Sequence, residues 1–458
     1  MTRNEEKHIS PLLKLALPLI ITGLVQASVF FFQTMFLAQK DPVVLAAGAI
    51  VSWLSATFGV ILFGTLGAIS ILVSHKYGAK DFDGIASVVR DGLWLSFLLT
   101  IPTFIFFWNC SSLFFYLGQS AQISELAKIY LHALAWGLLP NFVTIALLEV
   151  IIGLGHTKVI LKFSILTVCL SIFFSYALIF GRFGLPDLGI AGAGYGVSIG
   201  NWITLLAFVI YLRLYKQYHL YFSHLFVPSQ KSYYWELIKI GTPMGLMFCI
   251  EVGFFFVLTL LMGALGKDDL LAANQITMQF MGTLMAVIFS IAQAVTIRMG
   301  HLLGAGKINA ANKAAIVGIL LSCSLMLAVS GVFWFKPEAL IAIDFDLTNP
   351  NNNEIIGYAI SLFAVSALFQ IVESVRISLF GALRALKDTH FTLLISICSF
   401  WLIALPLGYS MAYYFNLAGK GFWWGMVAGA SFSVVVLFFR LRYKIKNFSF
   451  KEKGDLLF

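Results

Sequence analysis

Long apolar runs follow one another along almost the whole chain, separated by short polar segments. Each run has about 20 residues or more, which is the length that an α-helix needs to cross the hydrocarbon core of a bilayer. The first run is too long for a secretory signal and lacks a small-residue cleavage site, so we expect it to remain as a span. The pattern predicts an all-α membrane protein with twelve transmembrane helices, near residues 12–38, 43–74, 92–117, 126–152, 159–184, 190–214, 236–266, 270–302, 313–345, 355–382, 389–415 and 419–442.

The chain also repeats itself after about 226 residues. The stretch LAAGAI at 45–50 returns as LAANQI at 271–276, and Pro18 near the start of the first run corresponds to Pro243. A repeat of this length is a duplicated half, as in transporters built from two parallel repeats. We therefore predict two pseudo-symmetric lobes of six helices, residues 1–225 and 226–458, with the segment 215–234 as the hinge between them.

Composition and charge support a membrane location. Apolar residues make up 60% of the chain and charged residues 11%, against roughly 25% charged residues in a typical soluble domain. Twenty-three of the 30 Lys and Arg residues fall on one side of the predicted spans, so the positive-inside rule places both termini in the cytoplasm. The net charge of +9 then reflects topology and attraction to anionic lipids, and we expect no nucleic-acid partner.

Three acidic residues lie inside the predicted spans: Glu149, Glu251 and Glu373. A carboxylate at mid-span costs about 2.5 to 3.5 kcal/mol on insertion scales, so it is expected to face a bundle interior and to bind an ion, a proton or a cationic substrate. Glu251, in the seventh span, and Glu373, in the tenth, are predicted to face each other as a cation-coupling pair.

Each of these residues also has a structural interpretation. Glu251 as a neutral acid would bond a backbone carbonyl, and Glu373 would form an ion pair with Arg376, which follows at i+3. Glu149 lies nearer the cytoplasmic end of its span, so that it lines the mouth of the pathway or has a structural role.

The two halves differ at the position of Glu251, because Gln26 is its counterpart in the first half. Cation coupling is therefore expected in the C-terminal half. Gln26 and Gln33 are candidate substrate donors, with hydrogen bonding between helices as the alternative. We expect the polar wall of the substrate cavity to consist of Gln26, Gln33, Asn274, Gln275 and Gln279, with some of the 44 phenylalanines forming an apolar pocket.

Other functional classes find little support in the sequence. The segment 304–308, GAGKI, has neither the spacing nor the hydroxyl of a phosphate-binding loop. None of the eight histidines lies in a zinc-hydrolase pattern, and the five cysteines show no paired spacing. The repeated glycines at 192, 196 and 200 indicate close helix packing. We expect no enzyme activity, no cofactor and no resident metal.

At several points the sequence resembles the multidrug and toxic compound extrusion (MATE) transporters, in particular the NorM-like branch. The resemblance covers nearly the whole chain, and its most specific parts are LALP at 15–18, the loops at Gly78 and Gly304, GTP at 241–243 with Glu251, AANQ at 272–275, and Glu373 followed by GALR at 381–384 and KDT at 387–389. It implies two six-helix lobes around a V-shaped cleft, and export of drug-like organic cations or amphiphiles in exchange for H⁺ or Na⁺. It also implies that Glu251 and Glu373 couple the driving cation.

The sequence departs from that family in two respects. Gln33-Thr34 stands where members typically carry Asp-Thr, and Arg376 stands where an uncharged residue is expected. Phe369, one turn before Glu373, offers no oxygen for Na⁺. We therefore expect H⁺ as the driving ion, with Na⁺ at Glu251 and Glu373 as the alternative.

The alternative function is a flippase for lipid-linked oligosaccharides or another lipid, since Arg376 in a cavity would suit an anionic pyrophosphate. Such flippases are expected to carry several cavity bases, and this sequence offers one. For the transporter we expect a functional monomer in the bacterial inner membrane, in contact with membrane lipids.

Overall fold

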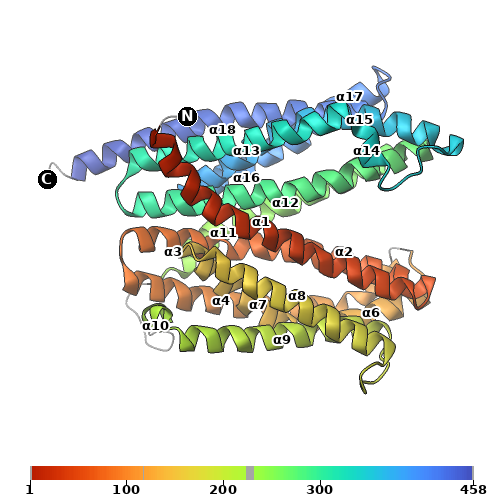
Figure 1. Ribbon diagram of the computed structural model, residues 1–458, viewed down its shortest axis with the longest axis horizontal. Coiled ribbons are helices and arrows are strands. Elements are labelled where there is room, and N and C mark those ends of the chain that lie inside the picture. The colour runs from red at the N-terminus through yellow and green to blue at the C-terminus, as the bar shows by residue number, and fades with distance from the viewer. Residues whose placement is uncertain (1–2, 117, 223–231, 456–458) are drawn as a thin grey trace. The chain divides into compact units, whose positions relative to one another are not determined.

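The computed structural model describes residues 3–116, 118–222 and 232–455, and nearly all of these residues are helical (Figure 1). The elements in chain order are α1 (Arg3–Ala38), α2 (Pro42–Leu66), α3 (Ala68–Gly78), α4 (Phe82–Asn109), α5 (Ser111–Tyr116), α6 (Ala121–Ala135), α7 (Leu138–Gly153), α8 (Thr157–Phe180), α9 (Ile190–Leu214), α10 (Lys216–Phe222), α11 (Tyr234–Gly263), α12 (Asp268–Gly304), α13 (Ile308–Phe335), α14 (Pro337–Ile341), η1 (Pro350–Asn352), α15 (Asn353–Ala385), α16 (Thr389–Ile397), η2 (Cys398–Ala404), α17 (Leu405–Tyr413) and α18 (Gly419–Asp455).

The prediction of twelve spans is confirmed. Within the described ranges, eleven helical segments are long and apolar enough to cross a membrane, and the bent pair α6–α7 makes a twelfth. Two spans differ most from the predicted bounds. The span predicted at 92–117 is α4, Phe82–Asn109, which begins earlier because a charged first turn hides its start; the Asp81 side chain caps it by accepting a hydrogen bond from Gly84 N at 2.9 Å. The span predicted at 313–345 ends at Phe335.

The fourth span is broken between α6 and α7, which meet at 51°. A break in a span frees backbone carbonyls, and inside a membrane these must find protein donors. Here α9 supplies them: Ser198 Oγ donates to Ala133 O at 2.7 Å, and Trp202 Nε1 donates to Trp136 O at 3.1 Å. A Cβ at Gly137 would lie 2.6 Å from Ser198 Oγ, so the bend depends on a glycine at this close approach.

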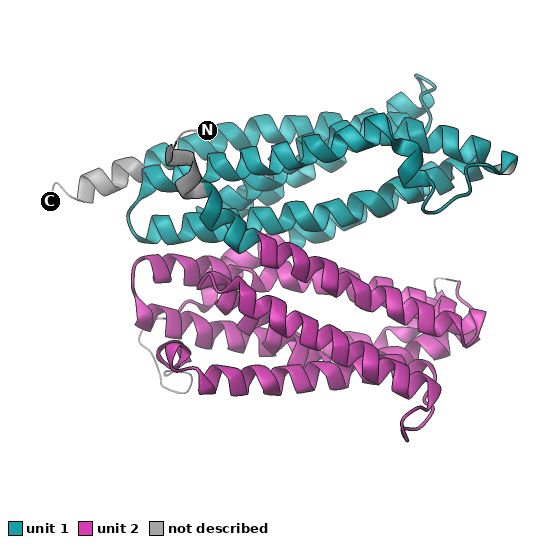
Figure 2. Cartoon of the chain, viewed as in Figure 1, with its two compact units in different colours: residues 1–16, 246–458 teal, residues 17–245 magenta. Residues whose placement is uncertain are grey.

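The chain divides into two compact units, residues 17–245 (unit 2) and residues 1–16 with 246–458 (unit 1) (Figure 2). Two helices therefore pass from one unit into the other: α1 after Ala16, and α11 after Gly245. Both passages lie close to the repeated prolines Pro18 and Pro243. The lobe boundary at residue 225 belongs to the sequence repeat and stays a prediction.

The segment predicted as a hinge is held to unit 2 at both of its described ends. At one end, Tyr218 of α10 is fully buried, with its hydroxyl 3.0 Å from His156 Nδ1. At the other end, the Asp91 carboxylate accepts hydrogen bonds from Tyr233 N at 2.6 Å and from Ser232 Oγ at 3.2 Å. Residues 223–231 of the predicted hinge lie outside the described residues.

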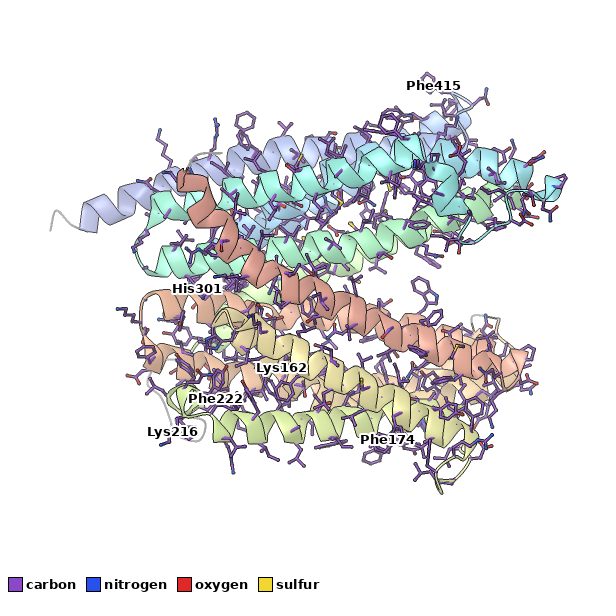
Figure 3. The ribbon with its side chains drawn as sticks, viewed as in Figure 1. Lys162, Phe174, Lys216, Phe222, His301 and Phe415 are labelled. Carbon is purple, nitrogen blue, oxygen red and sulfur yellow. The ribbon has the colours of Figure 1, made fainter. Side chains whose placement is uncertain are left out.

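Each unit has an aromatic core and an apolar outer surface. Unit 1 packs around Trp423 and Phe363, and unit 2 packs around Phe142. Trp53 of unit 2 is 75% exposed, and Phe415 of unit 1 is 71% exposed and projects outward (Figure 3). Soluble monomers seldom expose so much apolar surface, so these side chains are suited to lipid. The structure is that of a multi-pass membrane protein.

Candidate functional site

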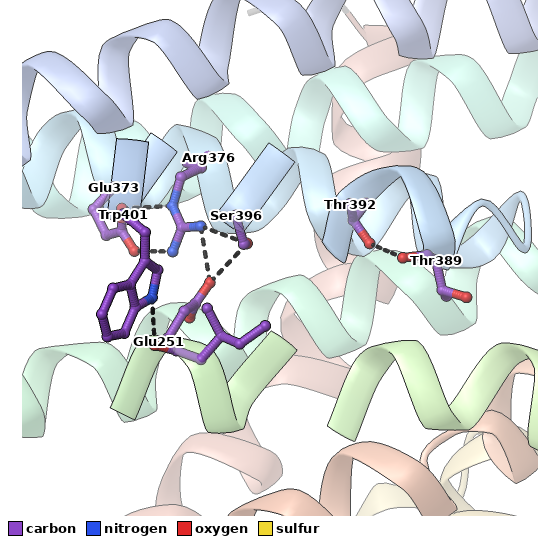
Figure 4. Close-up of polar contacts among 8 residues, drawn as sticks. Glu251, Glu373, Arg376, Thr389, Thr392, Ser396 and Trp401 are labelled. Carbon is purple, nitrogen blue, oxygen red and sulfur yellow. Dashed lines mark hydrogen bonds and ion pairs between the residues drawn. The ribbon is translucent and has the colours of Figure 1, made fainter. Parts of the chain in front are cut away.

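Three charged side chains meet in the interior of unit 1. Glu251 comes from α11, and Glu373 and Arg376 come from α15, one helical turn apart. Glu373 and Arg376 are fully buried, and Glu251 is 5% exposed. The structure thus brings together the two carboxylates that the sequence predicts as a pair, and it places the arginine between them (Figure 4).

Arg376 binds Glu373 in a two-bond arrangement. Arg376 Nε donates to Glu373 Oε2 at 2.7 Å, and Nη2 donates to Oε1. A planar guanidinium matches a carboxylate in this way, and such charge-assisted pairs are among the stronger hydrogen bonds in proteins. Glu373 therefore has the contacts expected of an i+3 ion-pair partner of Arg376.

Glu251 is held by fewer bonds. Its Oε1 accepts from Arg376 Nη1 at 3.0 Å and from Ser396 Oγ at 3.0 Å. Beside it, Trp401 Nε1 donates to the carbonyl of Ile250 at 3.2 Å. The alternative in which Glu251 bonds a backbone carbonyl is not the arrangement seen, because its bonding partners are two side chains.

Aromatic rings enclose the guanidinium. The centroids of the Phe380 and Phe400 rings both lie 4.7 Å from Arg376 Cζ, within the range of a cation–π interaction. Phe400 also packs against Phe254 of α11, with ring centroids 4.9 Å apart. The charged cluster thus lies in apolar surroundings, where an incomplete set of partners would be costly.

A π-helical segment positions one side of the cluster. The segment α16–η2–α17 forms one span, and η2, Cys398–Ala404, has π-helical geometry. An extra residue per turn shifts the side chains that follow relative to those that precede, and such segments occur often at functional sites. Ser396, Phe400 and Trp401 all face the cluster from this span.

The residues predicted to form the polar wall are partly buried and partly exposed in the structure. Asn274 is fully buried, and its Oδ1 accepts from Trp423 Nε1 at 3.1 Å. Phe369 is also buried and packs edge-on against Trp423, with centroids 5.9 Å apart. Gln275 and Gln279, on the same helix as Asn274, are exposed. Asn274 and Phe369 therefore belong to the core of unit 1, away from the exposed face of α12.

The remaining predicted residues lie in unit 2. Gln26 Nε2 is 3.4 Å from Ser164 Oγ. Gln33 is 3% exposed and its Oε1 accepts from Tyr130 OH at 3.1 Å, while its Nε2 has no hydrogen-bond partner among the described residues. Glu149 is buried in α7. These contacts join different helices, as the structural alternative for Gln26 and Gln33 expects.

Sequence reasoning missed parts of the cluster and a buried amide one turn from it. Ser396 and the rings that flank Arg376 gave no signal, because serine and phenylalanine are common in spans. Gln370 is 1% exposed, lies one turn before Glu373, and neither of its amide atoms has a hydrogen-bond partner among the described residues. In the sequence, Gln370 could have been noticed as a polar amide in an apolar run close to Glu373.

Comparison with known proteins places these residues in context. The model of the MatE family matches residues 18–177 and 243–410. The chain is 31% identical over 446 residues to the probable multidrug resistance protein NorM of Pseudomonas aeruginosa, covering 95% of this chain and 90% of that protein. It is 29% identical over 432 residues to the protein of the same name from Synechocystis sp., covering 94% and 93%.

Solved structures share the fold. An outward-facing multidrug resistance MATE family transporter of the MOP superfamily aligns with a TM-score of 0.85 and 20% identity, covering 96% of each chain. The eukaryotic MATE transporter AtDTX14 aligns with a TM-score of 0.82 and 19% identity, covering 97% of this chain and 98% of that one. The fold predicted from the sequence is confirmed.

Proposed function

The chain belongs to the MatE family of multidrug-resistance transporters, and on that premise we propose that it is a secondary active exporter of drug-like organic cations or amphiphiles. In this proposal H⁺ drives export by antiport, with Na⁺ as the alternative ion. The protein works as a monomer in the bacterial inner membrane, with both termini in the cytoplasm, as the distribution of Lys and Arg favours.

The observation that carries the proposal is the buried charged cluster of Glu251, Glu373 and Arg376. Ionisable residues within spans are expensive and usually mark ion or proton pathways. The cluster holds two carboxylates and one guanidinium, so that its net charge is −1 when both carboxylates are ionised. Uptake of one monovalent cation or proton would neutralise it.

Coupling then follows from affinity. The driving cation must bind one conformation of the exporter more tightly than the other, and the substrate must show the opposite preference. A cluster that is neutral when loaded and charged when empty supplies such a difference, because a charge is costly in a closed apolar interior and less so where water reaches it.

The flippase alternative has less support. It rests on Arg376 as a base for an anionic pyrophosphate, but Arg376 is fully buried and its guanidinium bonds both Glu373 and Glu251. An anion would have to displace two carboxylates to reach it.

Export is tested in proteoliposomes of known protein orientation, with a fluorescent cationic drug and an imposed H⁺ gradient, or a Na⁺ gradient at fixed voltage. We expect the wild type to respond to the H⁺ gradient. Glu251→Gln should lose at least about 90% of that response, and a tenfold loss of rate corresponds to about 1.4 kcal/mol. The same change at Glu354, which is exposed at the start of α15, is the matched control and should leave transport intact. Normal export by Glu251→Gln would refute the coupling role.

A further inference from the structure

The hydrogen bonds of the charged cluster leave little room for a metal ion. Both oxygens of Glu373 accept from Arg376, and Oε1 of Glu251 accepts from Arg376 and Ser396. The carbonyl of Ile250, the residue before Glu251, accepts from Trp401. Three of the four carboxylate oxygens of Glu251 and Glu373 thus already accept from donors of this chain.

We propose that Arg376 permanently fills the cation position between Glu251 and Glu373, so that this site does not take Na⁺ and instead exchanges a single proton at Glu251. This inference rests on the proposed function as a cation-driven exporter. It assigns three different roles: Arg376 is a built-in cation, Glu373 positions it, and Glu251 is the carboxylate that changes state.

The guanidinium is suited to stay in place. Arginine remains protonated in proteins, so its charge does not vary through a transport cycle. Arg376 is tied to Glu373 on its own helix by two bonds, and the rings of Phe380 and Phe400 cover it at 4.7 Å. A cation from solution would have to compete with the guanidinium of Arg376, which belongs to the chain itself.

Glu251 is the better candidate for proton exchange. Glu373 is fully buried and has both oxygens engaged, whereas the Glu251 side chain is 7% exposed and accepts bonds through Oε1. The charged groups that face Glu251 are Arg376 and Glu373 of α15, and the α16–η2 span presents the hydroxyl of Ser396. Addition of one proton to Glu251 takes the cluster from a net charge of −1 to zero, and its release restores the charge.

The cluster is unfavourable for binding Na⁺. It needs several oxygen ligands in close approach, as hard cations do, but here it would share carboxylates with a guanidinium of the same sign. Like charges a few ångströms apart in a weakly polar interior repel each other strongly. Removal of the guanidinium should therefore expose a cation site that the wild type keeps filled.

The test is Na⁺ binding by the purified full chain in detergent, measured with radioactive ²²Na⁺ and by the melting temperature in NaCl against choline chloride at equal ionic strength. We expect no saturable binding and no Na⁺-dependent melting shift in the wild type. Arg376→Gln should melt at a lower temperature in choline chloride, gain saturable ²²Na⁺ binding that the wild type lacks, and regain melting temperature in NaCl.

Two control variants locate the new site. Arg376→Lys keeps a positive charge and should bind no Na⁺, as in the wild type, although it loses the two-bond arrangement with Glu373 and should melt at a lower temperature. Addition of Glu251→Gln to Arg376→Gln should remove the gained Na⁺ binding. Failure of folded Arg376→Gln to bind Na⁺ would overturn the proposal.

A second measurement serves if Arg376→Gln does not fold. In the wild type and Glu251→Gln, proton release on addition of a cationic drug is followed with a pH indicator in weakly buffered detergent solution. We expect release of about one proton by the wild type and none by Glu251→Gln. Release of a proton by both proteins, or saturable ²²Na⁺ binding by the wild type that Glu251→Gln abolishes, would overturn the proposal. Both readouts are equilibrium measurements, so they remain distinct from a failure of gradient-driven export.

Discussion

Glu373 is predicted to matter more for stability than Glu251, because it supplies two of the bonds that satisfy Arg376. Glu373→Gln leaves Arg376 paired with Glu251, but Nε and Nη2 of the fully buried guanidinium lose their carboxylate acceptor. Poorly satisfied buried donors cost about 1 to 3 kcal/mol, and more when they are charged. We expect Glu373→Gln to lower the melting temperature of the detergent-solubilised protein well below that of Glu251→Gln. Equal melting temperatures for the two variants would contradict the assignment of Glu373 as the positioning residue.

His156 is predicted to make the protein less stable in acid. Burial lowers the pKa of His156, which lies between α7 and α8 with Nδ1 3.0 Å from the hydroxyl of Tyr218. The unfolded chain then binds a proton more readily than the folded chain, so stability falls as pH drops below about 6.5. Melting temperatures across this range should show a weaker acid loss in His156→Gln than in the wild type. An unchanged acid profile in the variant would assign the loss to other groups.

The two coupling carboxylates could be found from the sequence because a charge in an apolar run is rare and needs a reason. Ser396 could not be found, since a hydroxyl in a span costs little and commonly bonds its own helix, as Ser374 Oγ does to Ile371 O. Of the two carboxylate contacts of Arg376, one could be predicted from the sequence. The i+3 spacing gave the bond to Glu373, whereas the bond to Glu251 depends on how α11 and α15 pack.

At the scale of elements, α8 and α9 pack closely through a row of glycines, as their spacing predicts. A Cβ at Gly192 would lie 2.5 Å from the Leu178 backbone, and one at Gly200 would lie 2.8 Å from Ser171 Oγ. At Gly196 the added Cβ would overlap the backbone of Ser175. These small residues let the two helix backbones approach closely. Close packing matters here because the hydrophobic effect does not drive helices together inside a membrane.

Gly196→Val is therefore predicted to destabilise unit 2, because the helices would have to separate. Overpacking of this kind typically costs about 1 to 3 kcal/mol, which thermal unfolding in detergent would detect. Gly59→Ala in α2 is the matched control, since a Cβ there meets nothing within 4 Å. A melting temperature for Gly196→Val equal to that of Gly59→Ala would show that the two helices separate without cost.

Apolar run length predicts where spans lie but not their internal irregularities. The break between α6 and α7 and the π-helical turn η2 both occur inside continuous apolar runs, so that the hydropathy pattern passes over them. Gly137 and Pro140 are visible in the sequence, but the donors that make the break tolerable come from α9. The η2 turn has no comparable signal, because Cys398–Ala404 is an ordinary apolar stretch.

For the whole molecule, the passage of α1 and α11 between the units makes each half of the chain depend on the other. Residues 1–16 of the first half belong to unit 1, and residues up to 245 of the second half belong to unit 2. We predict that halves separated within residues 223–231 are unstable when expressed singly but form a stable complex when expressed together. Co-purification and the melting temperature of the pair measure this. Independent folding of either half, with the melting temperature that it has in the pair, would contradict the prediction.

This exchange of helix segments also bears on how such a chain arose. A half-length ancestor with the same first helix would have had its opening residues packed in the body of a second copy. The exchange is reciprocal, which is the arrangement of a domain-swapped homodimer. Gene duplication and fusion would then have joined two chains that already exchanged helix segments, with both described ends of the joining segment held on the same unit. The two copies differ at the position of Glu251: one carries this carboxylate and the other the amide of Gln26.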